Sequence, residues 1–106
     1  MESLFNIKIE NGTAKVTLSG RLDTSNAGAL ADELKTLIGQ EIHKVVFFVN
    51  DLEYISSAGL RVIIFAKQKI GTDTQVYLVG ANSTILDVVK MTGMDNFLFI
   101  QDTYQD

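Results

Sequence analysis

Two stretches near the N-terminus alternate apolar and polar residues, a pattern typical of half-buried β-strands. They are Leu4–Glu10 and Thr13–Ser19. Between them stand Asn11 and Gly12, which favour a two-residue hairpin turn because both of its central positions need a positive φ. The sequence therefore predicts an antiparallel hairpin. Its inward side chains are predicted to be Phe5, Ile7, Ile9, Ala14, Val16 and Leu18.

A helical period follows the hairpin. Apolar residues recur every three or four positions from Ala27 to Ile38 and form one stripe along a helix. Asp23 or Thr24 is the predicted N-cap, because a short side-chain oxygen accepts hydrogen bonds from the free N–H groups of a first turn. Gly39 is predicted to end this helix.

The middle of the chain combines an apolar run with a second helical pattern. Val45–Val49 has no alternation, which predicts a central strand covered on both faces. We expect a short loop at 51–55, and the apolar positions of Leu60–Ile70 predict a helix beyond it. Ser56 and Ser57 fall at the start of that helix. Free N–H groups and the positive end of the helix dipole favour either a capping hydroxyl or a phosphate there.

The last third of the chain predicts two more strands and one more helix. A strand is expected at Gln75–Gly80, and Asn82–Thr84 is predicted to cap a third helix that ends at Gly93. A short strand is expected at Phe97–Ile100. The polar segment Gln101–Asp106 is predicted to be a frayed or weakly helical tail.

The predicted order of elements is β-β-α-β-α-β-α-β, which indicates an α/β fold in a single domain over residues 1–106. Strand–helix–strand units with short loops favour parallel strands and right-handed crossovers. We therefore expect a mixed, mostly parallel sheet, made of an N-terminal hairpin followed by βαβ units. If each crossover moves one strand further in the same direction, the helices pack mainly on one face.

Composition narrows the classes of partner. The 106 residues include no cysteine and carry a formal net charge of −4. Nucleic acid and anionic membranes are gripped by clusters of Lys and Arg, so neither is an expected partner. The first residues have no basic region followed by an apolar stretch, so we expect no signal peptide. No apolar stretch approaches the ~20 residues of a membrane helix, so we expect no membrane span. A reducing cytoplasm suits a chain without cysteine.

Few residues could support catalysis or bind a metal. His43 is the only histidine, so a metal site would lack ligands. A Ser–His–Asp triad would need His43, before the central strand, to reach Ser57 beyond it. Asp51 and Glu53 are interpreted as solvated acids. The sequence predicts no catalytic residue, no metal and no cofactor, and we do not expect an enzyme.

Two segments, Leu18–Asp23 and Asp51–Val62, resemble the STAS family of anti-sigma factor antagonists. The resemblance covers nearly the whole chain and includes the order of its elements. It implies a cytoplasmic bacterial switch that, when unphosphorylated, binds an anti-sigma factor and frees the sigma factor. The anti-sigma factor is a serine kinase, which phosphorylates the antagonist at the start of the second helix and so dismisses it. A PP2C-type phosphatase reverses the modification.

The resemblance also implies which residue is modified. The family motif is Asp-Ser-Ser/Thr-Gly-Leu, with its first serine phosphorylated. Aligned on Gly59 and Leu60, the motif places Ser56 where the family has the acid and Ser57 at the phosphoacceptor position. Ser56 is therefore a rival phosphoacceptor. Asp23 matches an acidic residue in the loop that lies beside this site in the family.

The second helix offers a candidate contact surface. Val62–Ala66 is a run of five apolar residues, and one face on a sheet can bury only part of it. We expect Ile64 or Phe65, near Arg61, to be partly exposed for a partner. The alternative is that the first and third helices cover them. The predicted partner-binding set is Asp23, Thr24, Ser56, Ser57, Arg61, Ile64 and Phe65.

Two other functions remain open from the sequence. One is a STAS-like scaffold subunit of a transport or signalling complex, which is never phosphorylated. That function predicts that Ser57→Ala leaves partner binding unchanged. The other is a small hydrolase, which would need a base near Ser57, and the sequence offers none.

Overall fold

The computed structural model describes residues 5–70 and 74–104. Within these residues one sheet has the strand order β1-β2-β3-β4-β5, with β1 antiparallel to β2 and the remaining neighbours parallel. The mixed, mostly parallel α/β fold is confirmed. The strands are β1 (Phe5–Glu10), β2 (Thr13–Leu22), β3 (Lys44–Ile55), β4 (Gln75–Val79) and β5 (Phe99–Gln101). The helices are α1 (Ala27–Lys35), α2 (Ser57–Lys69), α3 (Ser83–Met91) and the short 3₁₀ helix η1 (Met94–Phe97).

The N-terminal hairpin forms as the alternation predicts. Asn11 and Gly12 have φ of 50° and 79°, which the two-residue turn requires. The predicted inward residues of β2 are buried. Ile9 of β1 is instead 45% exposed, since it lies in an edge strand next to the turn. Leu4 lies outside the described residues.

The predicted loop at 51–55 is wrong, because β3 continues as a strand to Ile55. β2 also runs past its predicted end, and the two extensions pair in parallel, with Gly20 opposite Leu52 and Leu22 opposite Ile55. The register of this long pair shifts at two places, between Thr17 and Ser19 and between Gly20 and Arg21. Only Ser56 therefore separates β3 from α2, so the sheet positions the start of α2 closely.

The first helix starts and ends differently from the prediction. Its N-cap is Asn26, not Asp23 or Thr24, because residues 23–26 form a turn before the helix begins. It ends at Lys35 rather than Ile38. The predicted end of the third helix is confirmed: Gly93, with φ of 75°, follows α3. The predicted end of the second helix at Gly71 lies outside the described residues.

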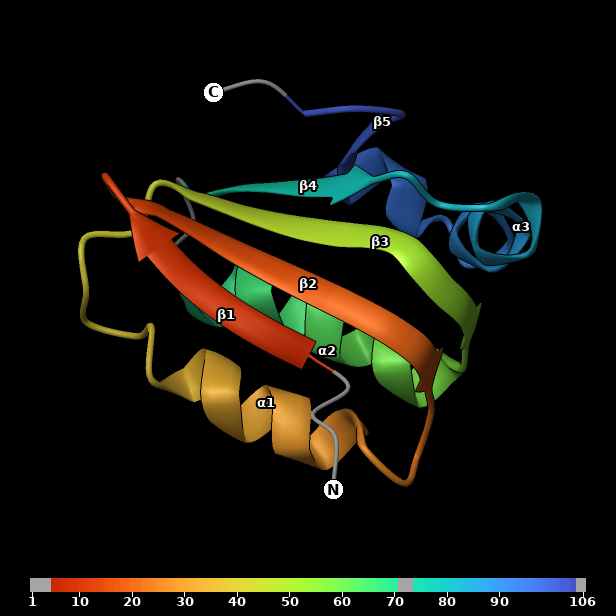
Figure 1. Ribbon diagram of the computed structural model, residues 1–106, viewed down its shortest axis with the longest axis horizontal. Helices are drawn as coiled ribbons and strands as arrows, with labels where there is room; N and C mark the ends of the chain where they lie inside the picture. The colour runs from red at the N-terminus through yellow and green to blue at the C-terminus, as the bar shows by residue number, and fades with distance from the viewer. Residues whose placement is uncertain (1–4, 71–73, 105–106) are drawn as a thin grey trace.

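The core lies between one face of the sheet and the helices. In Figure 1, α1 and α2 run side by side along one face of the sheet, and α3 lies near the C-terminal end of β3. All three helices contribute to one buried cluster, which confirms that they pack mainly on one face. Central members of that cluster are Leu30, Leu34, Val45, Phe47, Ile63, Ala66, Leu78 and Ile85.

Aromatic rings cover the other face of β3. Phe48 meets the ring of Tyr104 edge-on at 6.0 Å between centroids, and Tyr77 stacks on Phe99 at 5.0 Å. Tyr104 also contacts Tyr77, so the described part of the C-terminal segment is not the predicted frayed tail. The last strand begins at Phe99 because Phe97, predicted to start it, belongs to η1.

Candidate functional site

Ser56 is the N-cap of α2. Its backbone is extended, with φ of −89° and ψ of 171°, and its Oγ accepts a hydrogen bond from the Gly59 N–H at 3.2 Å. Its own N–H donates to the Leu22 carbonyl at 2.8 Å, and its carbonyl accepts from the Leu60 N–H at 2.9 Å. The half-buried Ser56 thus joins the end of β2 to the first turn of α2.

Ser57 is the first residue of α2 and its side chain is exposed. Within the described residues its hydroxyl makes no hydrogen bond, because Ser56 supplies the cap. The two serines of the motif therefore have different environments. One hydroxyl is used by the helix, and the other is presented to solvent at the positive end of the dipole.

Gly59 allows β2 to approach the first turn of α2. A Cβ added at Gly59 would lie 2.7 Å from Leu22 Cγ and 2.9 Å from the Leu22 carbonyl oxygen. Contacts this short do not occur between real Cβ atoms and their neighbours, so position 59 admits only glycine without a shift of the backbone. The contact places the turn that follows Leu22 next to the start of α2.

That turn presents a fixed negative charge. Asp23 Oδ1 accepts hydrogen bonds from the Ser25 hydroxyl at 2.6 Å and the Ser25 N–H at 2.9 Å. These bonds, and the Arg21 guanidinium 3.9 Å away, hold the pKa of the Asp23 carboxyl below its usual value. Asp23 is therefore an anion in the predicted partner-binding region, even though it does not cap a helix.

This arrangement predicts an acid-range titration for Asp23. Its folded pKa is depressed, so the stability it contributes is present above the unfolded pKa and is lost as the pH falls through the folded pKa. We expect the carboxyl ¹³C shift of Asp23 to titrate below the usual range for aspartate. In Ser25→Ala the midpoint should rise, because one donor is lost. An identical midpoint in the two proteins, measured by NMR, would contradict the hydrogen-bonded turn.

The remaining predicted contact residues follow along α2. Arg61 is exposed one turn beyond Ser57, while Ile64 and Phe65 are each partly buried against the core. The predicted partial exposure of the two apolar residues is thus confirmed, and their role in binding stays a prediction. Thr24 lies in the turn at residues 23–26.

Comparison with known proteins identifies the domain. The family model of the STAS domain matches residues 5–106. The chain belongs to the STAS domain family. Anti-sigma-F factor antagonist RsfB of Mycobacterium tuberculosis is 23% identical over 96 residues, which cover 91% of this STAS domain and 79% of RsfB.

Solved structures share the fold at low identity. Unphosphorylated SpoIIAA, an anti-sigma factor antagonist, superposes with a TM-score of 0.77 at 16% identity, covering 94% of this STAS domain and 89% of SpoIIAA. The phosphorylated form of the Bacillus protein gives 0.73 at 16% identity, covering 91% and 89%. A sulfate transporter family protein of Wolinella succinogenes gives 0.74 at 14% identity, covering 90% and 80%. Proteins with different names therefore share this fold, and the fold does not by itself assign a partner.

The STAS domain does not bring His43 near the serines. His43 immediately precedes β3, and Ser57 lies two residues after its end, so the whole length of this 12-residue strand separates them. The two side chains cannot form a catalytic pair. Across residues 5–70 and 74–104 no cluster of three His, Cys, Asp or Glu could hold a metal ion. Over the same ranges no helix is long and apolar enough to cross a membrane.

Sequence reasoning missed two parts of this site. Ser25 was not identified, although Asp-x-Ser is typical of a turn in which the acid accepts from the residue two positions on. The role of Leu22 was also missed, since its contact with Gly59 depends on packing between β2 and α2 and leaves no local pattern.

Proposed function

We propose that this STAS domain is a cytoplasmic anti-sigma factor antagonist, controlled by phosphorylation of Ser57. In the unphosphorylated form it binds an anti-sigma factor that is a serine kinase, and phosphorylation by that kinase releases it. A PP2C-type phosphatase restores the binding form. The observation that carries the proposal is the exposed hydroxyl of Ser57, which has no hydrogen-bond partner among the described residues. The names of RsfB and SpoIIAA support the class of partner.

The geometry favours Ser57 over Ser56 as the phosphoacceptor. Phosphate on Ser56 would have to leave its half-buried site or displace the Gly59 N–H, and loss of an N-cap costs about 1 kcal/mol. Phosphate on Ser57 would extend into solvent. It would still lie at a helix N-terminus, where backbone N–H groups and the dipole tolerate an anion. The fold can therefore stay the same while the surface changes.

The change in the surface is electrostatic. A phosphoserine adds a charge of about −1.5 to −2 at neutral pH. It would stand near the anionic Asp23 turn and one helical turn from Arg61, the i+4 position that can pair with it. The kinase surface is fitted to a neutral hydroxyl at Ser57 and to an unpaired Arg61. After phosphorylation the hydroxyl is replaced by a phosphate, and Arg61 pairs with that phosphate instead of with the kinase. Release would follow from repulsion and from the cost of desolvating the phosphate.

The alternative function is a scaffold that is never phosphorylated. It is favoured by Ser56, which replaces the acid of the family motif, and by the same fold in a sulfate transporter family protein. Under this alternative Ser57→Ala would leave partner binding and output in cells unchanged. Under the proposed switch the same variant would bind the kinase permanently, since it cannot be released.

Phosphoryl transfer in vitro tests the proposal. The protein is incubated with ATP and the serine kinase whose gene neighbours its own, and the added phosphate is located by mass spectrometry. We expect one phosphate on Ser57, none in Ser57→Ala, and continued transfer in Ser56→Ala, which serves as the matched control. Transfer to Ser56 alone would show that the assignment to Ser57 is wrong. No transfer, or transfer only outside 56–57, would contradict the switch itself.

A further inference from the structure

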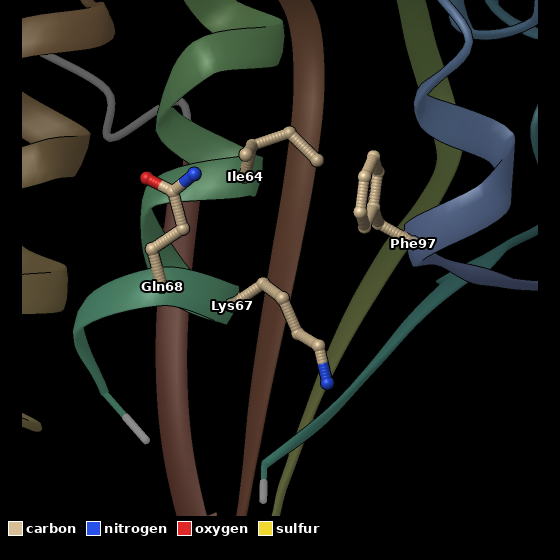
Figure 2. Close-up of a pocket in the computed structure, with 4 residues that line it drawn as sticks. All are labelled: Ile64, Lys67, Gln68 and Phe97. Atoms are coloured by element: carbon tan, nitrogen blue, oxygen red, sulfur yellow. The ribbon is translucent and has the colours of Figure 1, made fainter. Parts of the chain in front are cut away.

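A cavity of about 260 Å³ opens between α2 and η1. Ile64, Lys67 and Gln68 of α2 line one side, and Phe97 of η1 forms the other. Figure 2 shows the side chain of Ile64 pointing across the opening toward the ring of Phe97, with Lys67 extending along the same side. Phe97 is 58% exposed, so the cavity has an apolar wall that is open to solvent.

The cavity continues the exposed stripe that begins at Ser57. Ser57, Arg61, Ile64 and Gln68 are spaced i, i+4, i+7 and i+11, and so lie on one face of α2, away from the buried Ile63 and Ala66. Seven residues of helix span about 10 Å. Ile64 is thus close enough to Ser57 for one partner of ordinary interface size, about 800 Å² a side, to cover both.

The charge of the stripe indicates the chemistry of its partner. The whole chain has a net charge of −4, yet α2 contains no acidic residue. Arg61 lies on the stripe and Lys67 lines the cavity beside it, whereas Lys69 lies about 100° around the helix from Gln68. The Lys67 Nζ donates to the Thr74 carbonyl at 2.9 Å, which holds its side chain in place. Among the described residues Arg61 has no ion-pair partner. An acidic surface complements this helix.

We propose that the cavity receives a large apolar side chain of the anti-sigma factor kinase, from a segment that carries carboxylates on either side. This inference rests on the proposed function. Interface anchors of this kind fill pockets near the centre of a contact and provide much of its affinity. Ile64 and Phe97 supply the pocket, and Arg61 and Lys67 receive the carboxylates. Phosphate on Ser57 then acts on the same stripe, because it draws in Arg61 and repels the acidic segment.

Variants of the cavity wall test the inference. The probe is a serine kinase of the anti-sigma factor class from the same organism, titrated by calorimetry against unphosphorylated protein. Phe97→Ala and Ile64→Ala should each weaken binding by about 10- to 30-fold, as loss of an interface anchor does. Met91→Ala is the control: Met91 is 86% exposed on α3 and does not line the cavity, so its removal should change the affinity less than about 2-fold.

A charge variant keeps the test independent of folding. Gln68 is exposed, and Gln68→Glu changes its charge with almost no change of shape. We expect about a 10-fold loss of kinase binding from repulsion of the acidic segment. Gln101→Glu, an exposed site on β5, should bind as the wild type does. Circular dichroism confirms that each variant is folded.

The outcomes separate the inference from the proposed function. If the wild type binds the kinase and is phosphorylated on Ser57, but the Ile64, Gln68 and Phe97 variants bind equally well, the cavity proposal is overturned and the switch stands. If the wild type neither binds nor accepts phosphate, both are overturned. If the wild type sediments as a dimer that Phe97→Ala dissociates without loss of kinase affinity, the cavity belongs to a contact between two copies and the inference is wrong.

Discussion

Protein phosphorylated on Ser57 is expected to bind its anti-sigma factor kinase at least about 100-fold more weakly than unmodified protein, a change of about 2.7 kcal/mol. The reason is local. The phosphate brings a charge of about −2 to an exposed position that, unmodified, presents a neutral hydroxyl. A partner that covers this charge must remove its water. A charge that is buried at an interface without a partner weakens binding by about 2–5 kcal/mol or more. Calorimetry on the two purified forms measures the difference.

Two substitutions at the same position give the matched controls. Ser57→Ala removes only an exposed hydroxyl and should bind within about 3-fold of the wild type. Ser57→Glu carries roughly half the charge of a phosphate and should weaken binding by about 10-fold, midway on a logarithmic scale. All three proteins should have the same circular dichroism, because a helix N-terminus accommodates an anion. Equal affinities for the phosphorylated and unmodified forms would show that the charge at position 57 does not control the complex.

Capping chemistry was sufficient to place the start of α2 from the sequence. Two adjacent hydroxyls between an apolar run and a helical pattern predict a helix start, and α2 begins at Ser57 with Ser56 as its cap. The pattern could not tell which serine would cap, because that depends on the backbone of Ser56, which is extended by its bond to Leu22. The division of roles between the two serines is therefore a result of tertiary structure.

The predicted loop at 51–55 failed for a related reason. Asp51 and Glu53 suggested a solvated connection, yet they alternate with the buried Leu52 and lie on the exposed side of a strand. Pairing with the end of β2, some thirty residues earlier in the chain, stabilises that strand, and no local pattern records such a partner. Because that strand ends at Ile55, the sheet places the start of α2 at Ser57.

The sequence did not predict the cavity beside α2. The sequence predicts that Phe97 begins the last strand. In the structure Gly93 allows a turn into η1, and η1 holds Phe97 opposite Ile64. An apolar residue exposed by a short 3₁₀ helix gives no periodic signal, so its position followed only from the packing of η1 against α2.

The close approach of β2 to α2 predicts a large loss of stability in Gly59→Ala. The new methyl group would overlap the Leu22 side chain and lie against the Leu22 carbonyl, and the carbonyl already accepts the Ser56 N–H. Relief requires movement of the backbone that joins the two elements. Overpacking of this kind costs about 1–3 kcal/mol, and here it outweighs the gain in helix propensity of ~1 kcal/mol that alanine brings. Urea unfolding followed by circular dichroism measures the change.

Gly28→Ala is the matched control for this experiment. Gly28 is also helical, in α1, but a Cβ there would meet no atom within 4 Å. Only the difference in helix propensity between glycine and alanine then acts. The free energy of unfolding of this variant should therefore rise by about 0.5–1 kcal/mol. The two substitutions are chemically identical and should have opposite signs. If Gly59→Ala were as stable as Gly28→Ala, Leu22 would not press on the first turn of α2 in solution, and the Asp23 turn would have no fixed place beside Ser57.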